Sequence, residues 1–366
     1  MKTTVILALG AVLGLCASAA ARAQAPLERT DIQVPIVSTA PGMAGGTAQL
    51  YVREVRGANA DKGVVLFVHG AGTPAEVSFD APGASWMAYL AQAGFDTFSM
   101  DMEGYGRSTR PPAMDDPCNA PQATRDQIGG EPKACAAPYA GPITTMASDW
   151  NDIAAVVDHL LARTGAKRLS IVAWSQGGPR SFGYALAHPD KVERLAVLAP
   201  AYNRDMPDVL PAAMAPNFTP FGTQNRDEFI ANWNRQAPCP GQYDPAIRDA
   251  IWKEMLASDP VGAAWGTGMR RAPSVPSFGF NKAAAAKMTT PYLMISGATD
   301  AQVAPQRVRE LYEDLGSSDK VLVDMACASH NAMWEKDRVA LYKASLDWLT
   351  TGKVGGVSKG VVKLGY

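Results

Sequence analysis

The chain has 366 residues, of which 47% are hydrophobic, and a formal net charge of -1. This length allows one large α/β domain that carries an insertion, or two domains, with a sizeable hydrophobic core. The near-neutral charge, without a run of like charges, argues against nucleic acid or an anionic membrane surface as a partner.

The first 23 residues have the pattern of a secretory signal peptide. Lys2 precedes an apolar run over residues 5–15, and Ala21-Arg22-Ala23 is a cleavage site of the A-x-A type. The run is too short for a membrane-spanning helix, and the alternative is a buried N-terminal helix. We therefore expect residues 1–23 to be removed and a mature protein, beginning near Gln24, that is secreted or periplasmic.

Four cysteines follow the expected signal peptide, which itself contains Cys16. An even number in an oxidising compartment favours disulfides over metal ligation, and the spacing matches no zinc pattern. Cys118 and Cys135 lie close together in the chain, and a Cys239–Cys327 bond would tie a distant segment to the loop before His330. Four cysteines allow three pairings, so the sequence leaves the connectivity open, with buried free thiols as the alternative.

Short apolar runs alternate with segments of helical periodicity, whereas residues 24–46 look irregular. The alternation predicts an α/β fold with a mostly parallel, doubly wound sheet. We expect strands at residues 47–55, 63–68, 95–101, 169–172, 194–199, 291–297 and 321–325. We expect helices at residues 86–93, 148–160, 181–188, 303–315 and 332–349.

Two segments break this alternation. Residues 109–144 are rich in proline and alanine and lack clear periodicity, and residues 201–290 contain short helical patches but no convincing strand. We expect residues 24–200 and 291–366 to form the core, with residues 201–290 inserted between two core strands as a helical cap or lid.

The pentapeptide Ala173-Trp174-Ser175-Gln176-Gly177 follows an apolar strand and precedes a helical segment. This is the pattern of a nucleophile elbow, in which a sharp turn exposes the serine hydroxyl above the sheet, with Ala173 where glycine is commoner. Gly356-Val-Ser358-Lys-Gly360 matches the same letters, but no apolar strand precedes it and little chain follows it. The context therefore favours Ser175 as the nucleophile.

A nucleophilic serine needs a base, and the base needs an orienting carboxylate. The chain has four histidines. His69 lies in a turn, His159 within a helix and His188 at a helix end, whereas His330 occupies the loop after the last expected strand. Asp300 follows an earlier strand, and the order serine, acid, histidine is the one typical of this type of site. A helix N-cap is the alternative role for Asp300.

The tetrahedral intermediate needs two N–H donors for its oxyanion. The Gln176 amide, directly after the nucleophile, is one candidate. The Ala71 amide, in the turn His69-Gly70-Ala71-Gly72, is the other.

The chain resembles the α/β-hydrolase superfamily in five motifs: His69-Gly70, Asp101-x-x-Gly-x-Gly-x-Ser108, Ala173-x-Ser175-x-Gly177, Gly297-x-x-Asp300 and Ser329-His330. They fall in the family's order over roughly residues 47–350. The resemblance implies a serine hydrolase core with a lid between the sixth and seventh core strands, and we interpret Asp101 as structural. Epoxide hydrolases and haloalkane dehalogenases would need aspartate at position 175, so the serine there argues against both.

These motifs predict a carboxylic ester hydrolase that forms an acyl-enzyme and needs no metal or cofactor. An acyltransferase, a peptidase or a carbon–carbon bond hydrolase would use the same triad, and a binding protein without turnover is a further alternative. We expect a small-molecule ester substrate, no nucleic-acid partner and no membrane span. Trp174 and the tryptophans of the cap favour an apolar or aromatic substrate surface, with buried cap packing as the alternative explanation.

Overall fold

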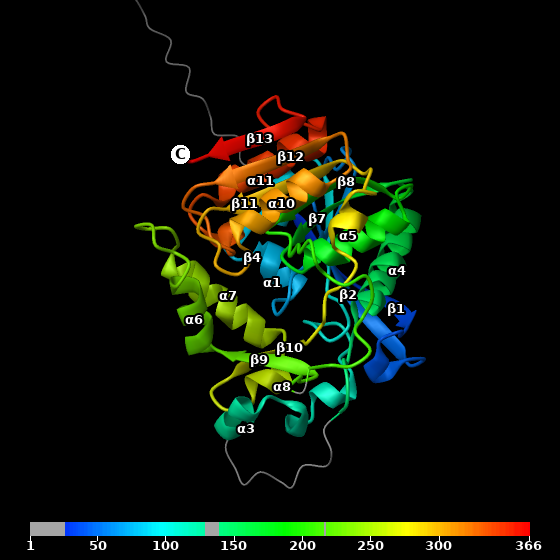
Figure 1. Ribbon diagram of the computed structural model, residues 1–366, viewed down its shortest axis with the longest axis vertical. Coiled ribbons are helices and arrows are strands. Elements are labelled where there is room, and N and C mark those ends of the chain that lie inside the picture. The colour runs from blue at the N-terminus through cyan, green and yellow to red at the C-terminus, as the bar shows by residue number, and fades with distance from the viewer. Residues whose placement is uncertain (1–25, 129–138, 216) are drawn as a thin grey trace, which may run out of the picture.

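A computed structural model of the chain describes residues 26–128, 139–215 and 217–366 (Figure 1). The expected signal peptide lies outside these residues, and so does Cys135, the expected partner of Cys118. In the described residues, no helix combines the length and the apolar character needed to span a bilayer.

A nine-stranded sheet forms the centre of the described structure. The neighbouring strands from β6 to β13 are parallel, whereas β1 pairs with β2, and β2 with β6, in antiparallel fashion. This confirms the predicted mostly parallel α/β fold. In order across the sheet, the strands are β1 (Glu28–Val37), β2 (Thr47–Arg56), β6 (Asp96–Met100), β3 (Val64–Val68), β7 (Leu169–Trp174), β8 (Val192–Leu198), β11 (Tyr292–Gly297), β12 (Lys320–Met325) and β13 (Lys359–Leu364).

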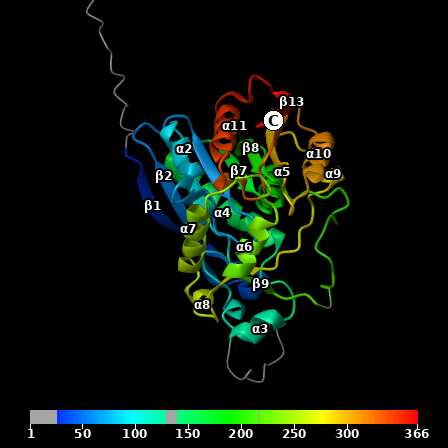
Figure 2. The ribbon, with the colours of Figure 1, turned by 90° about the vertical axis from the view of Figure 1, so that its left-hand side faces the viewer.

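Helices cover both faces of this sheet, with α2 and α11 on one face and α4, α5 and α10 on the other (Figure 2). Because the central strands are covered twice, they are buried along their length and read as continuous apolar runs. The helices are α2 (Trp86–Gln92), α4 (Met146–Thr164), α5 (Gly177–Ala187), α10 (Pro305–Asp314) and α11 (Arg338–Thr351). Between β3 and α2, the short elements are α1 (Ala75–Phe79), β4 (Asp80–Ala81) and β5 (Ala84–Ser85).

Both edge strands of the sheet were missed by the sequence analysis. β1 lies in the segment that looked irregular, and β13 lies in the glycine-rich tail. Each pairs on one side only and consists mostly of exposed and partly buried residues, with Val34 of β1 buried, so neither has the continuous apolar run of a central strand. Ser358 immediately precedes β13, an edge strand, and is not in a strand-turn-helix setting.

The described chain between β8 and β11, the sixth and seventh strands of the sheet in chain order, contains four helices. It also contains a two-stranded antiparallel sheet, which the sequence analysis did not expect because its strands include glycine, proline and several polar residues. The elements are β9 (Phe221–Asn225), α6 (Arg226–Asn234), α7 (Pro245–Ala257), α8 (Pro260–Ala263), β10 (Met269–Pro273) and α9 (Lys282–Ala285).

The described part of the segment over residues 109–144, residues 109–128 and 139–144, packs against these inserted elements. It contains α3 (Gln122–Ile128) and two short 3-10 helices, and α3 lies beside β9 and α8 in both views (Figures 1 and 2). A small apolar cluster joins Met114 and Ile143 to Phe221 and Trp265. Residues from both interruptions of the α/β alternation therefore share one cluster. The 3-10 helices among the described residues are η1 (Pro41–Met43), η2 (Pro112–Met114), η3 (Pro117–Asn119) and η4 (Ala332–Trp334).

Candidate active site

Ser175 occupies the turn between β7 and α5, at the carboxyl end of a central strand. Its φ of 57° lies in the left-handed region, which is uncommon for a residue with a side chain. This is the strained elbow that the sequence predicts, and Ser175 is partly exposed. Ala173 is buried in β7 and pairs with Val68, so its methyl group is accommodated in the sheet.

Glycines allow neighbouring backbone to approach this elbow closely. A Cβ at Gly70 would lie 2.8 Å from Ser175 Cβ and 3.4 Å from Ser175 Oγ. A Cβ at Gly177 would lie 2.4 Å from the carbonyl oxygen of Val68. The turn after β3 therefore lies against the serine, and both contacts require the absence of a side chain.

His330 and Asp300 meet at the same carboxyl edge of the sheet. His330, in the loop after β12, donates from Nδ1 to Asp300 Oδ2 at 2.8 Å. The other carboxylate oxygen of Asp300 accepts the amides of Gln302 and Val303, each at 2.8 Å. Oδ1 of Asp300 thus stabilises the turn that carries it, and Oδ2 holds the imidazole of His330.

Trp174 connects the serine turn to the histidine loop. Its indole Nε1 donates to the carbonyl oxygen of His330 at 2.8 Å, and the two ring centroids are 5.3 Å apart. In the described residues, Ser175 Oγ makes no direct hydrogen bond with His330. Because such bonds are often long before substrate binds, the arrangement is compatible with a serine-histidine pair that tightens in the complex.

The other three histidines have structural surroundings. His69 is fully buried, donates from Nδ1 to Gly70 O at 2.7 Å and accepts the Met102 amide on Nε2 at 3.1 Å. Burial and the nearby Arg180 hold the pKa of His69 well below its ordinary value, so this ring is neutral. His159 lies within α4, and His188 ends α5 with its ring against Tyr184.

The predicted oxyanion donors lie on both sides of the serine. In the part of the chain that the structure describes, neither the Ala71 nor the Gln176 backbone N–H has a hydrogen-bond acceptor. Ala71 is exposed and Gln176 is partly exposed. The Gln176 side chain is held by the Val275 carbonyl oxygen, to which its Nε2 donates at 2.8 Å.

Arg180 fixes the turn that carries Ala71, a role that the sequence analysis missed. Its guanidinium donates to the carbonyl oxygens of His69 and Gly70, both at 3.0 Å, and to Asp149 at 2.7 Å. Arg180 and Asp149 have fully buried side chains. Burial raises the pKa of Asp149, and the positive charge of Arg180 opposes that shift. An arginine five residues after the serine carries no sequence signal of this role, because only the packing of α5 against α4 and β3 brings it to the turn.

Asp101, which we interpret as structural, accepts the amides of Ala75 at 2.7 Å and Arg107 at 3.0 Å. Burial raises its pKa to about 6, and these two hydrogen bonds oppose the shift. The carboxylate is therefore used to organise the turns after β3 and β6.

The inserted segment is fastened to the histidine loop. Cys239 and Cys327 form a disulfide, which is one of the pairings that the sequence analysis left open. Gln236 Oε1 accepts the amides of His330 and Ala301, both at 3.3 Å. These contacts link the segment after α6 to the turns of both the histidine and the aspartate.

The tryptophans do not form an open aromatic surface. Trp174, Trp233, Trp252 and Trp265 are all buried. Trp233 packs against Trp334, and Trp252 stacks on Phe229. Packing within the protein, the alternative considered for these residues, therefore accounts for them.

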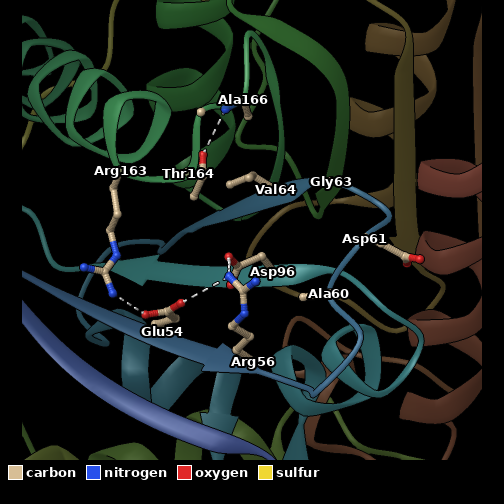
Figure 3. A pocket seen from close by; sticks show the side chains of 11 residues that line it. Glu54, Arg56, Ala60, Asp61, Gly63, Val64, Asp96, Arg163, Thr164 and Ala166 are labelled. Carbon is tan, nitrogen blue, oxygen red and sulfur yellow. Dashed lines mark hydrogen bonds and ion pairs between the residues drawn. The ribbon is translucent and has the colours of Figure 1, made fainter.

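A separate pocket of about 520 Å³ lies at the opposite, amino end of the sheet (Figure 3). It is lined by Glu54, Arg56, Asp96 and Arg163, and these charges pair with one another. None of the predicted site residues lines it, so the hollow is distinct from the serine site.

Residues 59–337 match the family model described as serine aminopeptidase, S33. The chain belongs to this hydrolase family. The match covers most of the chain and confirms that this serine aminopeptidase family member is an α/β-hydrolase, as the motifs implied. The chain matches no curated protein.

Solved structures with the same fold share little sequence with this family member. A serine hydrolase involved in carbazole degradation is 16% identical, with a TM-score of 0.51 and coverage of 87% of this chain and 99% of that one. An esterase from Thermogutta terrifontis is 18% identical, with a TM-score of 0.51 and coverage of 87% and 98%. The monoacylglycerol lipase from Paleococcus ferrophilus is 18% identical, with a TM-score of 0.50 and coverage of 83% and 99%. At these identities the likeness concerns the fold alone.

Proposed function

We propose that this family member is a secreted or periplasmic carboxylic ester hydrolase that works through an acyl-enzyme on Ser175. The observation that carries the proposal is the His330–Asp300 hydrogen bond at the sheet edge that also carries the elbow serine. The Cys239–Cys327 disulfide and the signal-like residues 1–23 support an oxidising location.

In this proposal, Ser175 Oγ attacks the acyl carbonyl while His330 takes its proton. The tetrahedral intermediate carries a negative oxygen that the Ala71 and Gln176 amides stabilise. His330 then returns the proton to the alkoxy oxygen, the acyl–oxygen bond breaks and the alcohol leaves. Water repeats the sequence on the acyl-enzyme, which releases the acid and restores Ser175, while Asp300 keeps Nδ1 of His330 protonated.

We also infer that residues 201–290 form a cap over the core, residues 24–200 and 291–366. Three contacts support this. A Cβ at Gly72 would lie 2.0 Å from Arg270, a Cβ at Gly104 would lie 2.4 Å from Pro273, and Gln176 donates to Val275. Residues 270–275 thus lie along the turns that carry Gly72, Gly104 and Gln176.

Peptide hydrolysis is the second candidate, because the matching family is described as one of serine aminopeptidases. The same triad would cleave an amide if the leaving amine were protonated by His330. An aminopeptidase must also accommodate a cationic amino terminus near the scissile bond. Arg270, whose guanidinium lies beside Gly72 in the proposed oxyanion turn, makes that electrostatically unfavourable.

The test compares a short and a long 4-nitrophenyl ester with aminoacyl 4-nitroanilides, using the full chain expressed in an oxidising compartment. We expect ester hydrolysis that falls by several orders of magnitude in Ser175→Ala and that a serine-directed phosphonate blocks. Ser358→Ala is the matched control, and it should retain full activity. Hydrolysis that survives Ser175→Ala would overturn the assignment, and faster cleavage of the anilides would favour the peptidase.

A further inference from the structure

Arg270, on β10, lies against the turn proposed to hold the oxyanion. A Cβ at Gly72 would lie 2.0 Å from Arg270 Nη1 and 2.5 Å from Cζ, so the guanidinium occupies the space beside the Gly72 backbone. Gly72 has a φ of 91°, in the left-handed region that favours glycine. Both its conformation and its lack of a side chain therefore let the arginine reach this turn.

The same turn contacts the serine. Gly70 lies against Ser175, and two residues of chain, at most about 7 Å, separate Gly70 from Gly72. Between them, Ala71 is exposed, and Ser175 and Arg270 are both partly exposed. When the carbonyl of a substrate reaches Ser175, a short polar group elsewhere on the same substrate can therefore reach the positive charge of Arg270.

The neighbouring arginine shows what a structural arginine looks like on this strand. Arg271 has a fully buried side chain and contacts Asp259 at 2.7 Å and Asp115 at 2.9 Å. Arg270 points to the other face of β10 and donates from Nε to Gln224 at 2.9 Å. Among the described residues, no carboxylate lies within 4.0 Å of its guanidinium, and its terminal nitrogens have no acceptor.

In the described residues, Arg270 has no ion-pair partner for its positive charge. Burial lowers the pKa of Arg270 to about 10, and Tyr105 and Glu228 oppose that shift. Arg270 therefore stays charged at neutral pH. Oε2 of Glu228 accepts the Asn225 amide at 2.9 Å, and the Tyr105 hydroxyl accepts from Arg180 at 3.2 Å. Neither group pairs with Arg270.

We propose that Arg270 binds a carboxylate of the substrate, so that the preferred substrates are esters that carry a free carboxylate on their acyl or alcohol part. This inference rests on the ester hydrolase function proposed above. The planar guanidinium presents paired N–H donors that match a carboxylate in a bidentate contact. A partly buried cation without an ion-pair partner is unfavourable by itself, and a substrate carboxylate would supply that partner.

The first experiment measures kcat/KM for monomethyl esters of dicarboxylic acids of several chain lengths, each beside the methyl ester of the corresponding monoamide. Acetate esters of hydroxycarboxylic acids and of their amides place the charge on the alcohol part instead. We expect the wild-type chain to favour the carboxylate over the amide by about 10- to 100-fold in one of these series. The series that shows the preference identifies the part that faces Arg270.

Two variants of Arg270 test the cause of this preference. Arg270→Met keeps the length of the side chain and removes its charge, so the preference should disappear while the amide substrates change by less than about threefold. Arg270→Lys keeps the charge without the fork and should retain part of the preference. Arg56→Met, at the amino end of the sheet, removes the same charge from the chain and should leave the preference intact.

Other results would overturn the proposal. It fails if the wild-type chain hydrolyses acids and amides equally well, or if Arg270→Met keeps the preference. It also fails if Arg270→Met slows the neutral substrates as strongly as the charged ones, because the arginine would then act on the reaction itself or on the fold. Melting temperatures of both Arg270 variants show whether the cap remains folded.

A labelling experiment separates this inference from the proposed function. Two serine-directed phosphonates that differ only in a terminal carboxylate or carboxamide are compared for their rate of reaction with Ser175. Faster labelling by the carboxylate probe, lost in Arg270→Met, supports the carboxylate site even for an ester that is turned over slowly. Equal labelling overturns the inference and leaves the nucleophile in place. If neither probe reacts, the proposed function fails, and the inference fails with it.

Discussion

Both ends of the central sheet carry charged side chains, but the two ends differ in how those side chains are paired. At the amino end, Glu54 contacts Arg163 at 2.9 Å and Arg56 at 3.9 Å, and Arg56 also pairs with Asp96 (Figure 3). Each arginine there has a carboxylate partner. The hollow between them is large, at about 520 Å³, and both arginines that line it form ion pairs within the protein.

At the carboxyl end, several hydrogen-bond donors lack a protein partner. The Ala71 and Gln176 amides have no acceptor in the described residues, and Arg270 has no carboxylate there. Unsatisfied donors in a folded protein are unfavourable, and they persist where a ligand completes them. The comparison teaches that concavity alone does not identify a site, and our proposal rests instead on the donors without a protein acceptor beside the strained serine.

A change from carboxylate to amide should lower kcat at the carboxyl end and leave kcat unchanged at the amino end. Asp300→Asn keeps the shape of the side chain and can still accept the Gln302 and Val303 amides through its oxygen. Its amide nitrogen would then face His330 Nδ1, which must accept and therefore loses its proton to Nε2. With the wrong tautomer, we expect kcat to fall by about 10⁴-fold.

Asp96→Asn is the matched change at the amino end, and it should leave kcat unchanged. Steady-state kinetics on one 4-nitrophenyl ester, with folded protein checked by circular dichroism, measure both variants. If Asp300→Asn stays within tenfold of the wild type, another group orients His330. If Asp96→Asn is equally damaged, the two ends are not functionally separate.

Two fully buried arginines allow a finer test of the carboxyl end. Arg180→Met removes the donor to the His69 and Gly70 carbonyls and leaves Asp149 without its counter-ion. Breaking such a buried pair destabilises a fold by about 3–5 kcal/mol. Because the turn that carries the Ala71 amide also loses its support, kcat per folded molecule should fall by up to about 10²-fold, the lower end of the effect of losing one oxyanion donor.

Arg271→Met is the control for this loss of stability. It breaks an equally buried pair with Asp259 but removes no hydrogen bond to the oxyanion turn. Urea denaturation should therefore show similar destabilisation in both variants, while kcat per folded molecule falls further in Arg180→Met. Equal kcat values for the two variants would mean that Arg180 is structural only.

The sequence contains enough information for the central strands and for the residues at their ends. Central strands read as apolar runs because helices cover both faces, and the residues directly after those runs, including Ser175 and Asp300, must meet at one edge of a parallel sheet. The contact between His330 and Asp300 follows from this regularity together with the order of the motifs.

Edge strands and tertiary contacts are beyond such reasoning. β1 and β13 pair on one side only, so solvent permits polar residues that mimic a loop. No sequence pattern predicts the roles of Arg180 and Arg270, because arginines are common on helices and short strands. Only folding brings Arg180 to the His69 carbonyl and Arg270 to Gly72. Whether an arginine is paired is a property of the packed structure.

The smallest expected effect concerns the pH dependence of stability at the amino end. Burial, followed by the negative charge of Glu54, raises the pKa of Asp96 from 3.8 to about 6, and Arg56 opposes this shift. Between these values the folded state binds a proton more tightly than the unfolded state does. The contribution of Asp96 to the free energy of unfolding therefore falls as the pH rises from about 4 to about 6 and stays constant above that range.

Asp96→Asn cannot titrate, so it should lose this slope. In urea denaturation at several pH values, the variant should gain stability relative to the wild type as the pH rises through this window. Glu54→Gln removes the neighbouring charge and should make the wild-type slope shallower without abolishing it. A difference between wild type and Asp96→Asn that is independent of pH would contradict the raised pKa. Because the amino end contributes nothing to the proposed chemistry, the kcat of both variants should stay at the wild-type value throughout, even where their stability differs.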